Sequence, residues 1–273
     1  LGCPTELDEV TGWSDPILNG GTLEDFDYRD LVITEDAPNW QLAHEMIRFG
    51  AEHARGKALM TVGAFGGCGD TLAALRGSLP LLHDLMDCPD YVRDFELYLM
   101  RQWIDVYQGF YNLVCEVDEG STCWFNLWSP GKFYATQNDF SYMISPKSFE
   151  EVFVPALELQ LDYLDHAVYH VDGICAFVHV PALTRLERLQ AIQILPGAGK
   201  PSPLYYLDAC KAVQAGGKNL HIGLPIGEVE EALRLLKPEG LFIDTWASTE
   251  EEAKALLKKA EKWSCQRPWE AHK

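Results

Sequence analysis

The sequence predicts an α/β protein built on a parallel sheet, and three observations carry this prediction. Six segments with the pattern of a buried strand are each followed by a segment with amphipathic helical spacing, an alternation typical of a parallel sheet. The chain has 273 residues, 47% of them hydrophobic, enough for one large core or two ordinary ones. No GxGxxG follows a strand, so a doubly wound dinucleotide fold lacks its fingerprint. The alternatives are a doubly wound sheet and a (β/α)8 TIM barrel.

The first part of the chain contains one of the six strand–helix units. Residues 1–35 are rich in Gly, Pro, Asp and Thr and predict loops, and residues 39–55 have the spacing of a helix. The run "ALMTVGAF" (58–65) predicts a buried strand, which a glycine-rich turn connects to a helix from about Thr71. A long amphipathic helix is expected over 89–114.

The other five units follow in order, each a short apolar run and then a helical pattern. The strands are expected over 121–128, 166–171, 189–195, 218–224 and 240–246, and the helices over 146–164, after Pro181, and over 205–215, 228–236 and 248–263. Ser248 followed by Glu251 predicts a capping box at the start of the last helix.

A barrel needs eight strands, and six are visible in this sequence. We therefore expect an α/β, (β/α)8 TIM barrel that lacks its N-terminal strands, with residues 1–273 as a single, N-terminally truncated barrel domain.

Charge and composition exclude several classes of function. The chain has 22 Lys+Arg against 41 Asp+Glu and a net charge of -19, which disfavours nucleic acids and anionic lipids as partners. No apolar run approaches the roughly 18 residues of a membrane span, and no charged-then-apolar leader opens the chain. The cysteines are scattered without a CxxC, which is typical of reduced thiols. We expect a cytoplasmic protein.

The expected strand ends define a candidate site, because chemistry in a barrel lies at the C-terminal ends of the strands. The residues expected there, or in the long loop beside it, are polar or aromatic: Asn126, Trp128, Asp139, His170, Asp172, Gln193, His221 and Trp246.

Within "YHVDG", His170 and Asp172 are two residues apart, so both side chains should point to one face of an extended strand. Three interpretations remain open for this pair. It could bind a metal such as Zn²⁺ through nitrogen and oxygen, act as an acid–base pair in which Asp fixes the imidazole tautomer, or satisfy loop amides. Cys175 and His179 follow Gly173 and should belong to the next loop and helix.

The other candidates also have structural alternatives. Asp139 could cap a turn, and His221 could be a core histidine whose hydrogen bonds are satisfied. Trp128 and Trp246 could form a flat apolar pocket or could simply pack.

Several longer segments resemble one enzyme superfamily. They are "RGSLPLLHDLMDCPDYV" (76–92), "NDFSYMISPKSFEEVFVPALELQLDYLD" (138–165), "YHVDG" (169–173), "AIQILPGAGKP" (191–201) and "LKPEGLFIDTWASTEEEAKALLKKA" (236–260). In order and spacing they resemble the uroporphyrinogen decarboxylase (URO-D) superfamily, and within it the divergent decarboxylase-like branch related to corrinoid-dependent methyltransferases. The resemblance covers nearly the whole chain and implies a (β/α)8 barrel.

The resemblance implies two chemistries. One is decarboxylation of the acetate arms of uroporphyrinogen without a cofactor, and the other is methyl transfer between a corrinoid and a thiol. The methyltransferases hold Zn²⁺ with a His-x-Cys pair and a later Cys. By this correspondence His170 is a ligand, Asp172 stands where the first Cys would be, and no Cys stands near Thr245–Trp246. A zinc site would therefore use nitrogen and oxygen.

We expect a methyl-transfer enzyme that acts on a corrinoid protein or a methylated small molecule. The assigned roles are catalytic for His170, Asp172 and Asp139, metal-binding for His170 and Asp172, and substrate-binding for Asn126, Trp128, Gln193, His221 and Trp246. The expected partners are a small-molecule substrate and a corrinoid carried by a second protein, with a homo-oligomer as an open alternative. Uroporphyrinogen decarboxylation and a non-catalytic barrel that binds a ligand or corrinoid are the alternative functions. Decarboxylation is disfavoured because an octa-anionic substrate calls for arginines, and none stands at the strand ends.

Overall fold

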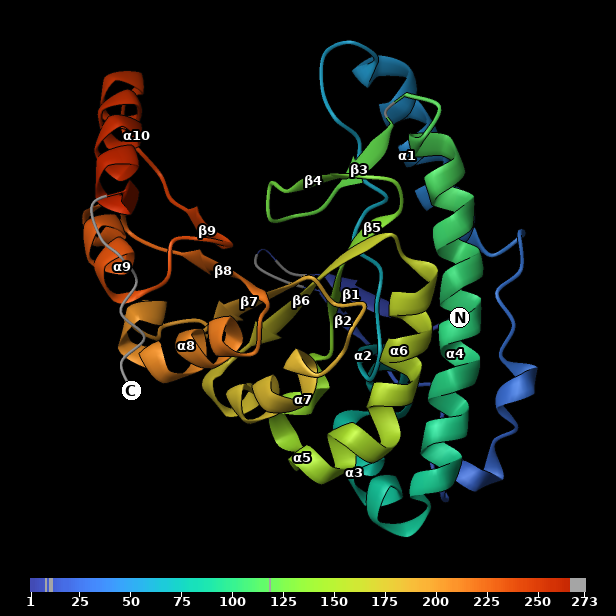
Figure 1. Ribbon diagram of the computed structural model, residues 1–273. Helices are drawn as coiled ribbons and strands as arrows, with labels where there is room; N and C mark the ends of the chain where they lie inside the picture. Colours follow the sequence, from blue (N-terminus) through green and yellow to red (C-terminus); the bar gives the residue numbers. More distant parts are fainter. Residues whose placement is uncertain (8, 10–11, 118, 266–273) are drawn as a thin grey trace. The chain divides into compact units, whose positions relative to one another are not determined.

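The computed structural model describes residues 1–7, 9, 12–117 and 119–265 and divides into two compact units (Figure 1). The first unit is Leu1–Ala167 and the second is Val168–Lys273. The architecture is mixed α/β with parallel strands, as the alternation of patterns predicts. In the described part of the chain, every helix is too short or too polar to cross a bilayer.

The first unit is dominated by helices. They are α1 (Pro38–Ala54), α2 (Asp70–Arg76), α3 (Ser78–Asp87) and α4 (Pro89–Val114). The predicted helices over 39–55 and 89–114 are confirmed as α1 and α4, and both begin with a proline, which lacks the N–H that the first helical position leaves unused. Residues at helical spacing along α4, among them Phe95, Leu99 and Trp103, are buried.

The predicted helix over 146–164 is confirmed, but it contains a widened turn. It comprises α5 (Pro146–Ser148), the π-helix η4 (Phe149–Phe153) and α6 (Val154–Tyr163). The N–H of Val154 donates to the carbonyl of Phe149, five residues back. Pro155 has no N–H for the carbonyl of Glu151, so an ordinary α-turn would leave that carbonyl without its usual donor.

The N-terminal segment is more ordered than its composition predicts. It contains the antiparallel pair β1 (Thr5–Leu7) and β2 (Gly12–Ser14) and the 3-10 helices η1 (Leu23–Asp25) and η2 (Tyr28–Asp30). Each element has only three residues, too few to produce a periodic pattern.

A buried arginine ties the N-terminal segment to the helices. Arg76 forms an ion pair with Asp84, with 2.7 Å between Nε and Oδ2, and both side chains are 3% exposed. The Arg76 guanidinium also donates to the carbonyls of Leu18 and Gly20, at 2.7 and 2.9 Å. Asp84 in turn accepts a hydrogen bond from the backbone N–H of Leu23 at 3.0 Å.

Two strand predictions in this unit are wrong. Residues 58–65 form one isolated bridge, between Thr61 and Thr122, because Gly63 adopts a φ of 86° that breaks an extended strand. Residues 121–128 are not one strand: they belong to an antiparallel hairpin of β3 (Gly120–Thr122) and β4 (Trp128–Pro130). The long loop expected between this predicted strand and the helix over 146–164 instead contains β5 (Phe133–Gln137) and η3 (Asp139–Met143).

The second unit holds the regular alternation. Its strands β6 (His166–Asp172, entering from the first unit), β7 (Ala191–Leu195), β8 (Asn219–Gly223) and β9 (Leu241–Asp244) pair in parallel in that order. The strands and helices predicted from residue 166 onward are therefore confirmed. The intervening helices are η5 (Ile174–His179), α7 (Val180–Thr184), η6 (Pro203–Tyr206), α8 (Leu207–Ala215), η7 (Ile226–Glu228) and α9 (Val229–Leu235).

The two faces of these strands differ in character. Ile192, Ile194 and Ile222 have no exposed surface, and α8, which contacts β7 and β8, is buried at Cys210 and Val213. We infer that this apolar face lies under the helices. The alternate residues, which must point to the opposite face, include the polar side chains His170, Gln193 and His221.

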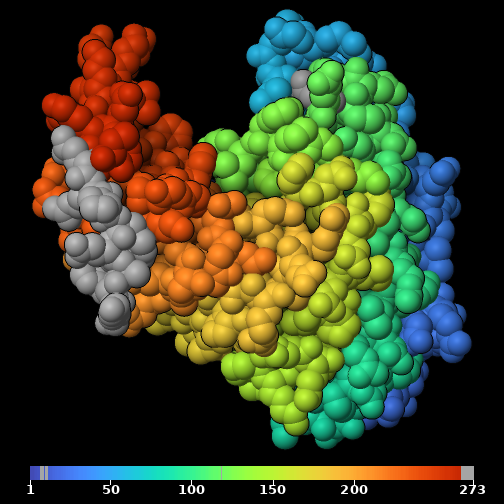
Figure 2. Space-filling model, in the orientation of Figure 1, coloured from blue at the N-terminus to red at the C-terminus, as the bar shows by residue number. Residues whose placement is uncertain are grey.

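The last helix, α10 (Glu250–Cys265), lies at the surface of the second unit and has no buried residue (Figure 2). The predicted capping box is displaced by one residue. The side chain of Thr249 accepts the N–H of Glu252 at 3.1 Å, and the Glu252 carboxylate accepts the N–H of Ser248 at 2.7 Å. The helix begins at Glu250, so Thr249, not Ser248, stands directly before its first turn.

Candidate functional site

The candidate site in the second unit is a row of polar side chains across three strands. The backbone register pairs His170 of β6 with Gln193 of β7, and Gln193 with His221 of β8. Residues aligned across a parallel sheet point to the same face. The structure thus brings together three of the residues that the sequence assigns to the site, on the face opposite the apolar one.

Gln193 fixes the state of the His170 ring. The Oε1 atom of Gln193 forms a short contact with Nδ1 of His170. An amide oxygen can only accept a hydrogen bond, so Nδ1 carries the proton and donates it. In the neutral ring, Nε2 is then the atom with the lone pair.

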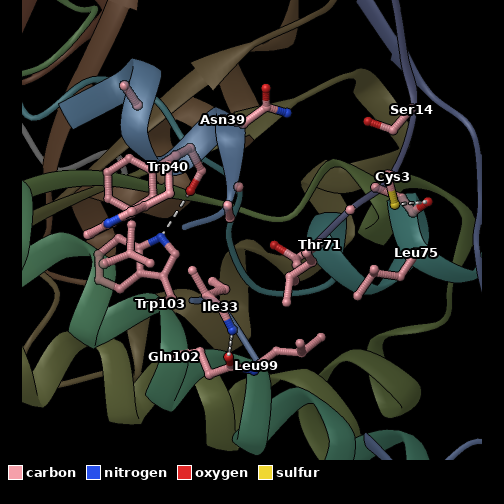
Figure 3. A pocket seen from close by; sticks show the side chains of 18 of the residues that line it. Cys3, Ser14, Ile33, Asn39, Trp40, Thr71, Leu75, Leu99, Gln102 and Trp103 are labelled. Carbon is pink, nitrogen blue, oxygen red and sulfur yellow. Dashed lines mark hydrogen bonds between the residues drawn. The ribbon is translucent and has the colours of Figure 1, made fainter. Parts of the chain in front are cut away.

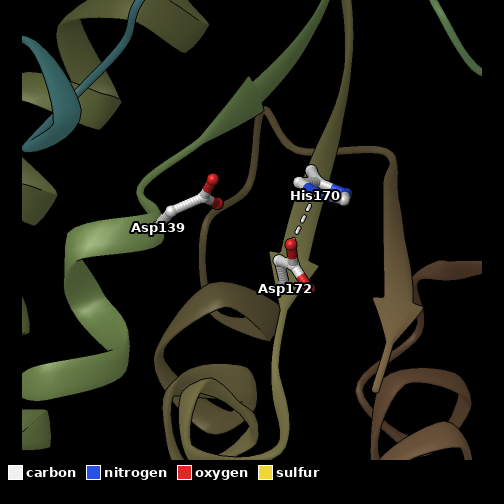
Figure 4. Close-up of side chains that lie close together, drawn as sticks. All are labelled: Asp139, His170 and Asp172. Carbon is white, nitrogen blue, oxygen red and sulfur yellow. Dashed lines mark ion pairs between the residues drawn. The ribbon is translucent and has the colours of Figure 1, made fainter. Parts of the chain in front are cut away.

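Asp172 lies beside that second nitrogen (Figure 4). Its Oδ2 atom is 3.9 Å from Nε2 of His170, and the two side chains are 37% and 11% exposed, respectively. The prediction that both side chains share one face of the strand is confirmed. A lone pair and a carboxylate facing each other repel, so a proton on Nε2 or a cation between them is needed to make this arrangement favourable.

His221 lies in a dry environment. It is 2% exposed, and its ring makes an edge-on contact with Phe242 at a centroid distance of 4.9 Å. Burial lowers the pKa of His221 to about 4 against the opposing effect of the Asp244 carboxylate, and a positive charge on His170 would act in the same direction as burial. His221 is therefore neutral at pH 7 and presents a polar ring without a charge.

The first unit contains three of the predicted site residues. Asn126 lies in the turn between β3 and β4 with a φ of 56°, a conformation that asparagine tolerates well, so the turn alone accounts for this residue. Trp128 on β4 is exposed. Asp139 begins η3, which is capped by the Asn138 side chain and not by Asp139. The assignment of these three residues to substrate or catalysis stays a prediction.

Trp246, in the second unit, follows β9 and is 83% exposed. Its role in binding a substrate also stays a prediction. Cys175 and His179 lie in η5, beyond the end of β6, as the position of Gly173 predicts.

Sequence reasoning missed two acids of the first unit, the half-buried Asp70 and the buried Glu96. Burial, and to a smaller extent the neighbouring Asp139 carboxylate, raise the pKa of the Asp70 carboxyl to about 6. The side-chain amide of Gln137 donates to both carboxylates, at 3.1 and 3.4 Å. Burial raises the pKa of Glu96 to about 8. The sequence did indicate that Glu96 would be buried, because it falls among the apolar positions of α4.

Comparison with protein-family models and with curated proteins found no match. The resemblance to the URO-D superfamily therefore rests on the sequence motifs alone.

Proposed function

We propose that the chain is a methyl-transfer enzyme of the URO-D superfamily, built on a (β/α)8 barrel. Its site would lie on β6, β7 and β8, and its reaction would involve a corrinoid protein or a methylated small molecule. One observation supports this proposal over the alternatives: Gln193 holds Nδ1 of His170, and Asp172 lies beside Nε2.

This arrangement favours metal binding over acid–base catalysis. In an acid–base pair the aspartate would hold Nδ1 and leave Nε2 for the substrate, whereas here an amide holds Nδ1 and the carboxylate lies on the Nε2 side. Metal-ligating histidines usually donate their other N–H to an oxygen, as His170 does to Gln193.

The donor set fits Zn²⁺ in part. His170 would supply a nitrogen and Asp172 an oxygen, two of the four ligands that Zn²⁺ takes, and a thiol substrate or water would occupy an open position. A bound Zn²⁺ would lower the pKa of a thiol and so supply the nucleophile for methyl transfer. The neutral His221 next in the row would add no second positive charge to the site.

The rest of the proposal concerns the surroundings of the enzyme. We place it in the cytoplasm, with a small-molecule substrate and a corrinoid-carrying protein as partners, and with formation of a homo-oligomer as an open question. Uroporphyrinogen decarboxylation and non-catalytic binding of a ligand or corrinoid are the competing functions.

The test combines metal binding and turnover. The chain is titrated with Zn²⁺ by calorimetry and is then assayed for loss of the methyl group from methylcobalamin in the presence of a small thiol. We expect Zn²⁺ to bind and turnover to require it, and we expect His170→Ala and Asp172→Ala each to reduce both by about 100-fold.

His83→Ala is the matched control, because His83 is an exposed histidine of α3. Its binding and turnover should stay at the level of the unmodified chain. Unchanged Zn²⁺ affinity in His170→Ala would refute the metal site. Zn²⁺ binding without any methyl transfer would favour the non-catalytic function.

A further inference from the structure

A cavity lies entirely within the first unit (Figure 3). It is bounded by the N-terminal segment and by α1, α2 and α4, and its volume is about 650 Å³. That volume falls within the range of small-molecule sites, about 300–1,000 Å³. All of its lining residues belong to the first unit, so it is distinct from the row of polar residues on β6 to β8.

Aromatic rings form one side of the cavity. Trp40 of α1 stacks on Phe110 of α4 with ring centroids 5.0 Å apart, and Phe65 stacks on Trp103 at 5.4 Å. The Trp103 indole N–H donates to the backbone carbonyl of Phe65 at 3.1 Å, which fixes the orientation of that ring. The cavity thus offers flat aromatic surfaces, and the indole N–H of Trp103 already has an acceptor in the protein.

Most polar groups at the cavity already have partners in the protein. Gln102 accepts from the N–H of Ile33 at 2.8 Å and donates to the carbonyl of Leu31 at 2.6 Å. The Thr71 hydroxyl oxygen accepts the N–H of Gly67 at 3.3 Å, which leaves the hydroxyl proton to donate elsewhere. A ligand would therefore find a largely apolar wall and few hydrogen-bonding groups.

The charge of the lining excludes anions. Asp70 lies at the cavity, and none of the described lining residues is Lys or Arg. The net charge of the whole chain is -19, so an anionic ligand would meet repulsion without a compensating Lys or Arg side chain among the described lining residues.

We propose that this cavity binds an uncharged, flat aromatic small molecule, with the Trp40 and Trp103 rings as its principal contacts. The proposal is independent of methyl transfer. A second copy of the chain inserting into the cavity is the competing occupant, and the experiment separates the two.

The probes are a matched pair of dyes. N-phenyl-1-naphthylamine is neutral, and 1-anilinonaphthalene-8-sulfonate has the same ring system with an added sulfonate. We expect the neutral dye to bind with one-to-one stoichiometry and at least about 10-fold more tightly than the sulfonate, because a desolvated anion would have no partner. Equal affinity, or a preference for the sulfonate, would overturn the proposal.

Variants locate the binding site. Ala43→Phe in α1 and Ala74→Phe in α2 each place a ring in the cavity. Each should lower the affinity for the neutral dye by at least about 10-fold. Ala255→Phe adds the same ring to the exposed surface of α10 and should leave the affinity unchanged. Undiminished binding in both cavity variants would place the dye elsewhere and end the proposal.

A further readout does not depend on the folding of those variants. Energy transfer from tryptophan to the bound dye should fall in Trp40→Phe and in Trp103→Phe, because both rings line the cavity. Dye binding that decreases as the chain self-associates, followed by sedimentation velocity, would assign the cavity to a second copy and overturn the small-molecule proposal.

Discussion

At the scale of single residues, Glu96 shows how burial controls a charge. Its Oε2 atom accepts the backbone N–H of Gly69 at 3.1 Å, whereas Oε1 has no hydrogen-bond partner among the described residues. Burial raises its pKa from 4.5 to about 8, so the folded chain keeps this carboxyl protonated at pH 7. In the unfolded chain the same group is ionised, and the two states therefore bind different numbers of protons.

The first prediction is a pH dependence of stability that originates at Glu96. The folded state holds more protons than the unfolded state between pH 4.5 and about 8, so the free energy of unfolding should decrease as the pH rises through this window, by up to about 1.4 kcal/mol per pH unit. Glu96→Gln keeps an acceptor for Gly69 and cannot ionise. In urea denaturation series, this variant should lose the part of the pH dependence that Glu96 causes. The raised pKa of Asp70 should leave a smaller decrease of the unfolding free energy with rising pH.

Glu52→Gln, at an exposed position of α1, is the control and should leave the slope intact. If Glu96→Gln and the unmodified chain showed parallel curves, the carboxyl would not be neutral in the folded state.

Part of the candidate site could be predicted at this scale. Strand geometry places residues two apart on one face, so the proximity of His170 and Asp172 followed from the sequence. The hydrogen bond from His170 to Gln193 did not, because it depends on the alignment of β6 with β7, two strands separated by 18 residues of helix and loop (173–190). Pairing register between strands is set by tertiary packing, which a local pattern does not contain.

At the scale of elements, the pair of Arg76 and Asp84 ties α2 and α3 to the N-terminal segment. Arg76→Met would leave a buried carboxylate without its cation, at a cost of about 3–5 kcal/mol in urea denaturation. The double variant Arg76→Met with Asp84→Asn removes the buried charge and keeps an acceptor for the N–H of Leu23. It should be more stable than Arg76→Met alone. A double variant that is equally or less stable would mean that the carbonyl contacts of Arg76, and not the ion pair, hold this region.

The start of α10 provides a second prediction for an element. Thr249→Ala removes the hydroxyl that accepts the N–H of Glu252 and should destabilise the first turn by about 1 kcal/mol. Hydrogen exchange of the Glu252 amide should accelerate about fivefold. Ser248→Ala is the control, because Ser248 contributes its backbone N–H to the cap. Similar acceleration in both variants would contradict the assignment of Thr249 as the cap.

Elements were predicted best where a single segment determines its own structure. The long helices α1 and α4 follow from their prolines and apolar spacing, and strands β6 to β9 from short apolar runs between helices. Residues 58–65 have the composition of a strand, yet within the first unit they bridge only at Thr61. A strand exists only where a neighbour supplies its hydrogen bonds, and composition does not reveal the neighbour.

At the scale of the whole molecule, the net charge of -19 bears on the competing decarboxylase function. An octa-anionic porphyrinogen would be repelled on approach and would lose its hydration without gaining arginine contacts at the strand ends. We therefore expect uroporphyrinogen to be decarboxylated far more slowly than about 1 per second. The measurement is product formation under anaerobic conditions. Turnover at or above that rate would favour uroporphyrinogen decarboxylation over methyl transfer as the function.

The π-helix at Phe149–Phe153 also constrains how the length of the chain can vary. A π-turn accommodates one residue more than an α-turn, so a single deletion there would ordinarily restore a regular helix. In this chain the restored turn would direct a carbonyl at the ring of Pro155. Related chains that are one residue shorter in this segment should therefore also have replaced the proline, so that deletion and substitution are inherited together.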